Sequence, residues 1–184
     1  MNSLKLRRLL IHIHLYLAGF LAPGFLLVAF SGALYLAQLN GGTQSTPIAL
    51  PANITLDSAS PSIEEDVRAV LKQAGVDVRF EYIRGRGDRF MTRPTTRDFV
   101  VFENGPDGLN ATLESPSFTY AMMELHKGHG PRIFRMYSIV AGIALFLVVL
   151  GGLAVGLLAK NYRRPTLIST GIGAVIFIVL GFVL

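Results

Sequence analysis

Three long stretches of hydrophobic residues dominate the chain, and a mixed polar region separates the first from the second. The stretches cover Leu9–Leu39, Ile133–Ala159 and Thr166–Leu184. Each is about as long as the ~20-residue helix that crosses a bilayer, and few ionisable side chains interrupt them. The pattern therefore predicts three transmembrane helices.

The polar region between the first two stretches has the pattern of a small α+β domain. Residues 41–60 are rich in Gly, Pro, Ser and Thr, which predicts a partly extended linker. Ser60-Pro61 then opens a helix with one apolar stripe, and Gly75 ends it. The pattern that follows predicts antiparallel strands and a second short helix, at Val78–Ile83, Arg89–Met91, Phe99–Glu103, Leu109–Leu113 and Phe118–Leu125.

The predicted fold class is therefore membrane α-helical, with three transmembrane helices and a small α+β domain between the first and second. We expect the tail and first helix at 1–39, the linker at 40–60, the domain at 61–127, a turn and the second helix at 128–159, a short loop at 160–165 and the third helix at 166–184. The small-residue pairs Gly152/Gly156 and Ser169/Gly173 fit either a three-helix bundle or a homodimer seam.

Composition excludes several classes of function. The chain has no cysteine, so a disulfide scaffold, a zinc ribbon, a Cys-ligated iron–sulfur site and a covalent c-type haem are excluded. It has no HExxH and no Gly-x-Ser-x-Gly motif, and all four histidines lie outside the predicted strands. We therefore do not expect a hydrolase.

The distribution of charge predicts the orientation of the helices. Six cations without an acid among them flank the hydrophobic stretches: Lys5, Arg7, Arg8, Lys160, Arg163 and Arg164. Residues 40–135 carry the other eleven Lys and Arg and all twelve acids. Positive charge in short loops stays cytoplasmic. We expect the N-terminus and the 160–164 loop inside, and residues 40–132 and the C-terminus outside. The basic pI is then a topology signal, and no nucleic-acid partner is expected.

The histidines are the most informative residues, because ionisable groups at membrane depth are costly and often functional. His12 and His14 are two positions apart, so they cannot face the same site on a helix. His14 shares its face with a stripe of alanines and is the better candidate to face inward. The alternative is a histidine that is hydrogen-bonded in the headgroup zone.

Two segments around these histidines resemble a known family. The first hydrophobic stretch reads LLIHIHLYLAGFLAPGFLLVAFSGALYL, which is similar to the first helix of PepSY-associated transmembrane proteins. The second signature reads MELHKGHGPRIFRMYSIVAGIALFLVVLGGLAVGLL, with a Leu-His pair before a Gly-containing turn, an arginine and a long apolar helix. The resemblance covers nearly the whole chain. It implies that the external domain is periplasmic and PepSY-like.

The resemblance implies a protein of the bacterial inner membrane that takes part in iron and siderophore uptake. Larger relatives resemble reductases that hold haem b and pass electrons to iron in the periplasm. By position, His14 and His126 are the residues that would ligate the haem iron. His129 is a further candidate ligand, and Arg132 and Arg135 would pair with haem propionates or grip lipid phosphates.

Membrane thickness restricts how a haem could be held. His14 is expected near the inner surface and His126 at or beyond the outer one, and the hydrocarbon core between them is ~30 Å thick. One iron cannot be ligated by both, so a bis-histidine haem needs a second copy of the chain or a partner subunit. The leading hypothesis is thus haem-mediated ferric-siderophore reduction. The alternative is a non-enzymatic accessory protein whose external domain binds a peptide or a partner protein.

Overall fold

The computed structural model describes residues 3–51, 54–105 and 108–183. In these residues, three helices are long and apolar enough to cross a membrane, over Arg8–Leu36, Arg132–Leu158 and Lys160–Val183. A five-stranded antiparallel sheet lies between the first and second of them in the sequence. The chain is a multi-pass membrane protein with a small sheet domain, and it divides into two compact units.

The first unit comprises residues 1–25 and 139–184. It contains the N-terminal part of α1 (Ser3–Leu36), most of α4 (Arg132–Leu158), α5 (Lys160–Ile178) and a π-helical turn, η1 (Val179–Val183). The short loop expected at 160–165 is helical, because α5 already begins at Lys160 and only Ala159 separates it from α4. Gly156 permits this tight turn, since a Cβ there would lie 2.5 Å from Oγ1 of Thr166.

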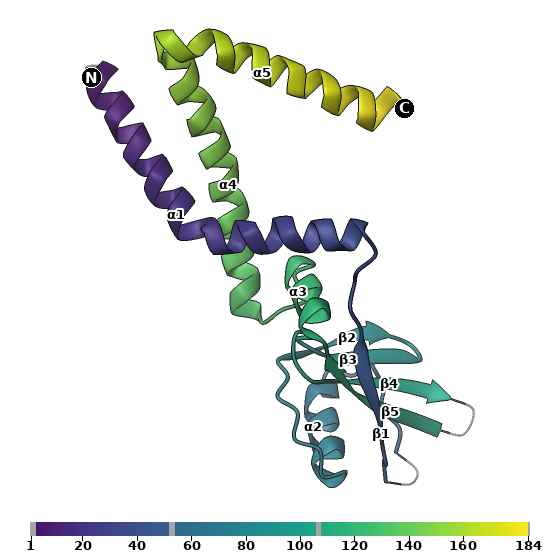
Figure 1. Cartoon of the computed structure of the whole chain (residues 1–184). Helices are drawn as coiled ribbons and strands as arrows, with labels where there is room; N and C mark the ends of the chain where they lie inside the picture. The colour runs from purple at the N-terminus through teal and green to yellow at the C-terminus, as the bar shows by residue number, and fades with distance from the viewer. Residues whose placement is uncertain (1–2, 52–53, 106–107, 184) are drawn as a thin grey trace. The chain divides into compact units, whose positions relative to one another are not determined.

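The second unit comprises residues 26–138 and contains the sheet (Figure 1). Its strands follow the order β1-β5-β4-β3-β2. Their bounds are Thr43–Ile48 for β1, Tyr82–Arg86 for β2, Arg89–Arg93 for β3, Phe99–Gly105 for β4 and Gly108–Pro116 for β5. Every neighbouring pair is antiparallel, with Val100 opposite Leu113 and Phe90 opposite Phe102.

The prediction of a linker over residues 40–60 is wrong for part of its first half. Residues Thr43–Ile48 form β1, which pairs with β5 along its whole length, from Thr43 opposite Pro116 to Ile48 opposite Ala111. Pro47 is tolerated because β1 is an edge strand, where a missing N–H leaves no gap in the sheet. The sheet domain therefore begins before residue 61.

Helix α2 (Ile63–Gln73) covers one face of the sheet. Its apolar stripe, with Val67 fully buried, packs on Phe90, Val100 and Phe102, and the Phe90 and Phe102 rings stack at 5.1 Å. Three acids occupy its first turn, where they favour the positive end of the helix dipole. The helix starts two to three residues later than Ser60-Pro61 predicts, and it ends just before Gly75, whose φ is +71°.

Helix α3 (Phe118–His126) packs on the opposite face, where the Tyr120 ring stacks on Phe99 of β4. Ser117 begins the helix and accepts a hydrogen bond from the Tyr120 amide with its side chain. The strand expected at Val78–Ile83 begins only at Tyr82, which is paired with Arg93. Pro94 follows Arg93 and has no N–H, so the pairing stops there.

Candidate functional site

The chain reverses direction just after α3, so that His129 lies back against the last turn of that helix. Gly128 has a φ of +75° and follows the last helical turn. The Gly128 amide donates to the Leu125 carbonyl at 3.1 Å, and the His129 amide donates to the Glu124 carbonyl at 2.8 Å. This pair of bonds is the Schellman motif that a glycine at this position favours. As a result the His129 ring lies beside the Glu124 carboxylate.

Glu124 is the centre of a buried polar cluster. Its side chain is only 6% exposed, and it accepts hydrogen bonds from Thr95 Oγ1, from His129 Nδ1 at 2.7 Å and from Arg93 Nη1 at 3.2 Å. Lys127 Nζ lies 3.3 Å from its other oxygen. Buried carboxylates are stable in proteins only when they are paired and hydrogen-bonded in this way. We call these five residues the Glu124 cluster.

Burial and close neighbours change the pKa of Glu124 and of the nearby Tyr120 phenol. Burial on its own raises the pKa of Glu124, but the hydrogen bonds from Thr95, His129 and Lys127 and the charge of His129 outweigh it, so the pKa lies below its ordinary value of 4.5. Burial, followed by the nearby Glu124 charge, raises the pKa of the Tyr120 phenol. Glu124 is thus an anion at neutral pH and holds His129 by its Nδ1.

His126, the last residue of α3, is held by α1. Its Nδ1 lies 2.7 Å from Oγ of Ser31, which is fully buried. Its ring packs against Gly32, where a Cβ atom would lie 3.5 Å from Cε1 of His126. The Ser31 hydroxyl donates to the Leu27 carbonyl at 2.6 Å, so its oxygen accepts from His126. Nδ1 of His126 therefore carries a proton, and in the neutral ring Nε2 keeps its lone pair.

His14 has the same arrangement within the first unit. Its Nδ1 lies 3.2 Å from the Val148 carbonyl of α4. Gly152, one turn further along α4, faces the His14 ring, because a Cβ there would lie 3.5 Å from Cε1. A carbonyl can only accept, so Nδ1 donates and Nε2 again keeps the lone pair. His14 is half-buried in this contact.

His12 differs from His14 in its surroundings. It is exposed, its Nδ1 lies 2.8 Å from the Arg8 carbonyl on its own helix, and its ring stacks on Tyr16. The two rings therefore occupy different sides of α1, as their spacing requires. Of these two histidines, His14 is the one that hydrogen-bonds to another candidate transmembrane helix.

Arg132 and Arg135 begin α4 and contact the approach to β2. The Arg132 amide donates to Glu81 Oε2 at 2.9 Å, and its Nη2 donates to the Glu81 carbonyl at 3.1 Å. Arg135 Nη2 donates to the Tyr82 hydroxyl at 2.6 Å. The first turn of α4 contains no acid of its own, so Glu81 supplies the negative charge that stabilises its N-terminus. Both guanidinium groups remain exposed.

The structure thus brings His126, His129, Arg132 and Arg135 into the second unit, whereas His14 belongs to the first. The sequence reasoning missed Ser31 and the Glu124 cluster. Ser31 lies in the Ser-Gly-Ala segment near the C-terminal end of the first hydrophobic stretch, and this segment is a usable signal. Glu124 offers no such signal in the sequence, because a single acid between two methionines and a leucine does not reveal which residues it will contact. In the described parts of the chain no three His, Asp or Glu side chains gather to hold a metal ion.

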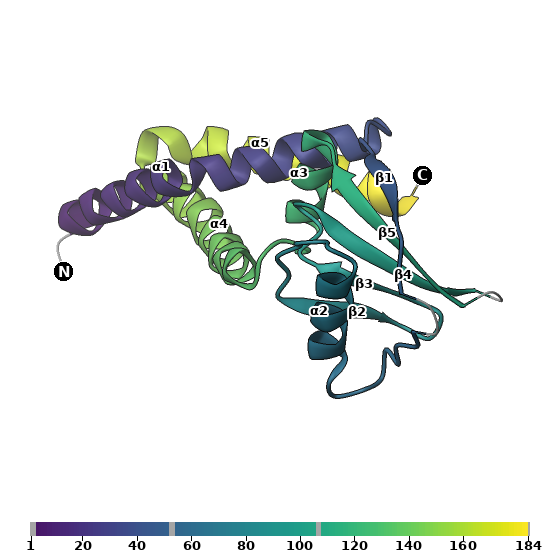
Figure 2. The same ribbon diagram turned by 90° about the horizontal axis from the view of Figure 1, so that it is seen from below.

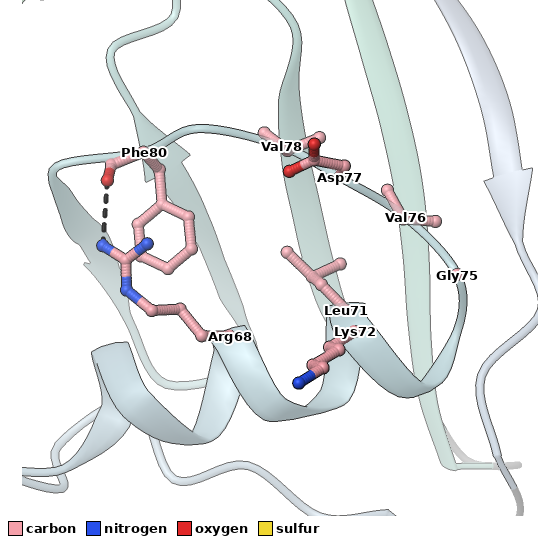
Figure 3. Close-up of a pocket in the computed structure, with 8 residues that line it drawn as sticks. All are labelled: Arg68, Leu71, Lys72, Gly75, Val76, Asp77, Val78 and Phe80. Atoms are coloured by element: carbon pink, nitrogen blue, oxygen red, sulfur yellow. Dashed lines mark hydrogen bonds between the residues drawn. The ribbon is translucent and has the colours of Figure 1, made fainter.

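A groove of about 380 Å³ lies on another part of the second unit, between the end of α2 and residues 75–80 (Figure 3). Leu71, Val76 and Phe80 line it together with charged side chains. Arg68 crosses one end, where its guanidinium donates to the Phe80 carbonyl at 2.9 Å and stacks 4.0 Å from the Phe80 ring centre. The groove is apolar along its floor and charged at its rim.

Comparisons with protein-family models, with curated proteins and with solved structures give no match to this chain.

Proposed function

We propose that the chain is a bacterial inner-membrane component of iron and siderophore uptake, in which His14 and His126 ligate haem b for ferric-siderophore reduction. The observation that carries the proposal is the arrangement of these two rings. Each donates through Nδ1 to a fixed acceptor, the Val148 carbonyl or Ser31 Oγ, and each keeps the Nε2 lone pair. Histidines that bind a metal are oriented in this way by their second nitrogen.

The surroundings of both rings also support haem ligation. Gly152 lies against the His14 ring and Gly32 lies against the His126 ring, so each imidazole packs closely on a neighbouring helix that helps to fix its orientation. Haem iron bound by histidine can change its oxidation state by one electron, which is the chemistry that ferric-siderophore reduction requires. The protein's part is to fix the two rings in position. The resemblance to PepSY-associated transmembrane proteins agrees with this role.

The remaining candidate residues take supporting roles in the proposal. His129 has its Nδ1 on Glu124 and offers Nε2 as a further ligand. Arg132 and Arg135 would use their free N–H groups to pair with haem propionates while they stay attached to Glu81 and Tyr82. If haem is bound, a second histidine for each iron would have to come from a second copy of the chain or from a partner subunit.

The positive-inside distribution supports the proposed orientation, with the N-terminus in the cytoplasm and the sheet domain and the C-terminus in the periplasm. An odd number of spans places the termini on opposite sides. In this orientation the Glu124 cluster and His126 belong to the periplasmic side, where a ferric siderophore would arrive.

Growth on a ferric siderophore as the only iron source tests the proposed role. We expect His14→Ala and His126→Ala to abolish the growth that the wild-type gene restores to a deletion strain. His12→Ala is the matched control, because His12 bonds only to its own helix, and it should grow like wild type. Full growth of both His14→Ala and His126→Ala at wild-type protein levels would exclude the proposal.

The groove beside α2 favours a second candidate, a non-enzymatic accessory protein whose external domain binds a peptide. An apolar floor with Arg68, Lys72 and Asp77 at the rim suits an extended peptide with one charged end. In this case Lys72→Glu, which reverses an exposed charge at the rim, should abolish growth, and His14→Ala should not. The two candidates therefore predict opposite results for the same pair of variants.

A further inference from the structure

Phe118, the first residue of α3, is 82% exposed. Among the described residues between 40 and 131 it is the one large apolar side chain that lies open to the surroundings. The rest of the sheet domain buries its large apolar residues against α2 or α3. A phenylalanine left so exposed in an otherwise well-covered domain indicates a contact with something apolar.

The start of α3 is fixed beside the end of the first membrane span. The Ser117 amide donates to the Gly42 carbonyl at 2.9 Å, and the Gly42 amide donates to Ser117 Oγ at 3.2 Å. Gly41 lies so close to α3 that a Cβ there would approach the Tyr120 nitrogen to 2.7 Å. Gly41 and Gly42, which follow the end of α1, are therefore the residues that contact Ser117 and Tyr120 on either side of Phe118.

That segment carries exposed apolar side chains of its own. Leu36, the last residue of α1, is 83% exposed, and Leu39 is 60% exposed. Leu36 also ends the candidate span Arg8–Leu36, so its surface continues the lipid-facing surface of that helix. We call Leu36, Leu39 and Phe118 the apolar rim.

The other end of α3 contacts α1 about one and a half turns before Leu36. His126 bonds to Ser31, which precedes Leu36 by five residues, about 7.5 Å along a helix. Nearby, Lys127 Nζ lies 5.9 Å from the ring centre of Tyr35, and both side chains are partly exposed. Tyrosine and lysine side by side are typical of the headgroup level of a membrane. Helix α3 is therefore held along the outer end of α1 (Figure 1).

We propose that α3 is an interfacial helix that lies in the outer leaflet of the bilayer, with the apolar rim inserted among the lipid chains and Lys127 at the phosphates. The contact anchors the sheet domain to the membrane surface at the end of α1. It is independent of haem binding, because none of the rim residues is a candidate ligand.

The absence of tryptophan from the chain makes a direct test possible. Phe118→Trp gives a single tryptophan, whose emission can be excited selectively and measured in phosphatidylcholine–phosphatidylglycerol vesicles with and without bromine on the acyl chains near the headgroup. We expect a blue-shifted emission that loses most of its intensity in the brominated vesicles. Phe20→Trp, at a residue 78% exposed within the α1 span, is the positive control and should be quenched as well.

Gln73→Trp is the matched negative control. Gln73 is the exposed last residue of α2, which lies away from α1 within the second unit (Figures 1 and 2), so bromine should not quench it. Leu39→Trp repeats the test at a second rim position in case Phe118→Trp fails to fold. An emission like that of Gln73→Trp would overturn the proposal. A blue-shifted but unquenched emission would overturn it too, since it would show a protein contact in place of lipid.

Discussion

Nδ1 of His126 donates to Oγ of Ser31 over 2.7 Å, although the two residues are 95 positions apart. The bond joins the last residue of α3 to a buried position of α1, and it fixes which nitrogen of the ring is protonated. The same contact therefore attaches the sheet domain to a candidate membrane helix and, in the proposed function, would leave Nε2 available to bind haem iron. This double role makes Ser31 the most informative position for substitution.

Ser31→Ala removes the acceptor for His126 while it changes the volume of the buried position little. We expect a loss of about 1 kcal/mol in the free energy of unfolding, which is the typical value of one hydrogen bond. Thermal unfolding in detergent micelles measures it. Ser138→Ala is the matched control, because the Ser138 hydroxyl donates only to the Phe134 carbonyl of its own helix. Equal effects of the two substitutions would contradict the role assigned to Ser31.

Glu124→Gln removes the negative charge that Arg93 needs. Both side chains are buried, at 6% and 10% exposure, so the substitution leaves an uncompensated guanidinium, and we expect a cost of about 3–5 kcal/mol. Glu103→Gln is the control, since the Glu103–Arg89 pair is exposed and is worth at most about 1 kcal/mol. Chemical unfolding of the two variants measures the difference. A smaller loss for Glu124→Gln than for Glu103→Gln would show that the cluster is not structural.

The depressed pKa of Glu124 predicts acid sensitivity with a defined sign. A carboxyl whose pKa is lower in the folded state than its ordinary value of 4.5 adds stability above that value and loses it as the pH falls through the folded-state pKa. Melting temperatures from pH 7 to pH 3 should therefore fall more steeply for the wild type than for Glu124→Gln. Parallel curves would mean that Glu124 does not contribute to acid unfolding.

The proposed topology predicts the reading of reporter fusions. Fusions at residue 45, at residue 162 and at the C-terminus should report outside, inside and outside, because the six uncompensated cations stay in the cytoplasm. Only Ala159 separates α4 from α5, so the turn between these two candidate spans is short. A C-terminus that reports inside would remove α5 as a span.

Hydrophobic patterning predicted the three long helices and most of the sheet, because length and alternation are local properties of the sequence. It failed at β1, where the polar segment TQSTPI becomes a strand only because β5 offers it an unpaired edge. It failed at the start of β2 for a related reason, since Pro94 shortens the partner strand. Pairing between distant segments decides both cases.

The candidate site was predictable only in part. The four histidines stand out in a hydrophobic chain, and the spacing of His12 and His14 indicates that they face different sides. The acceptors that orient the rings do not stand out, because a backbone carbonyl such as that of Val148 has no sequence signal. The Glu124 cluster depends in the same way on Gly128, whose positive φ returns His129 to the helix.

The reduced-minus-oxidised absorption spectrum of the purified protein tests the central claim most directly. We expect a sharp Soret band and an α-band from haem with two axial histidines. His14→Ala and His126→Ala should each remove one haem and leave the other, and His12→Ala should leave the spectrum unchanged. Self-association or partner binding should weaken with either loss, because each iron would join two polypeptides. A colourless preparation from haem-replete cells, or the same bis-histidine spectrum from a strictly monomeric, partner-free protein, would contradict the account.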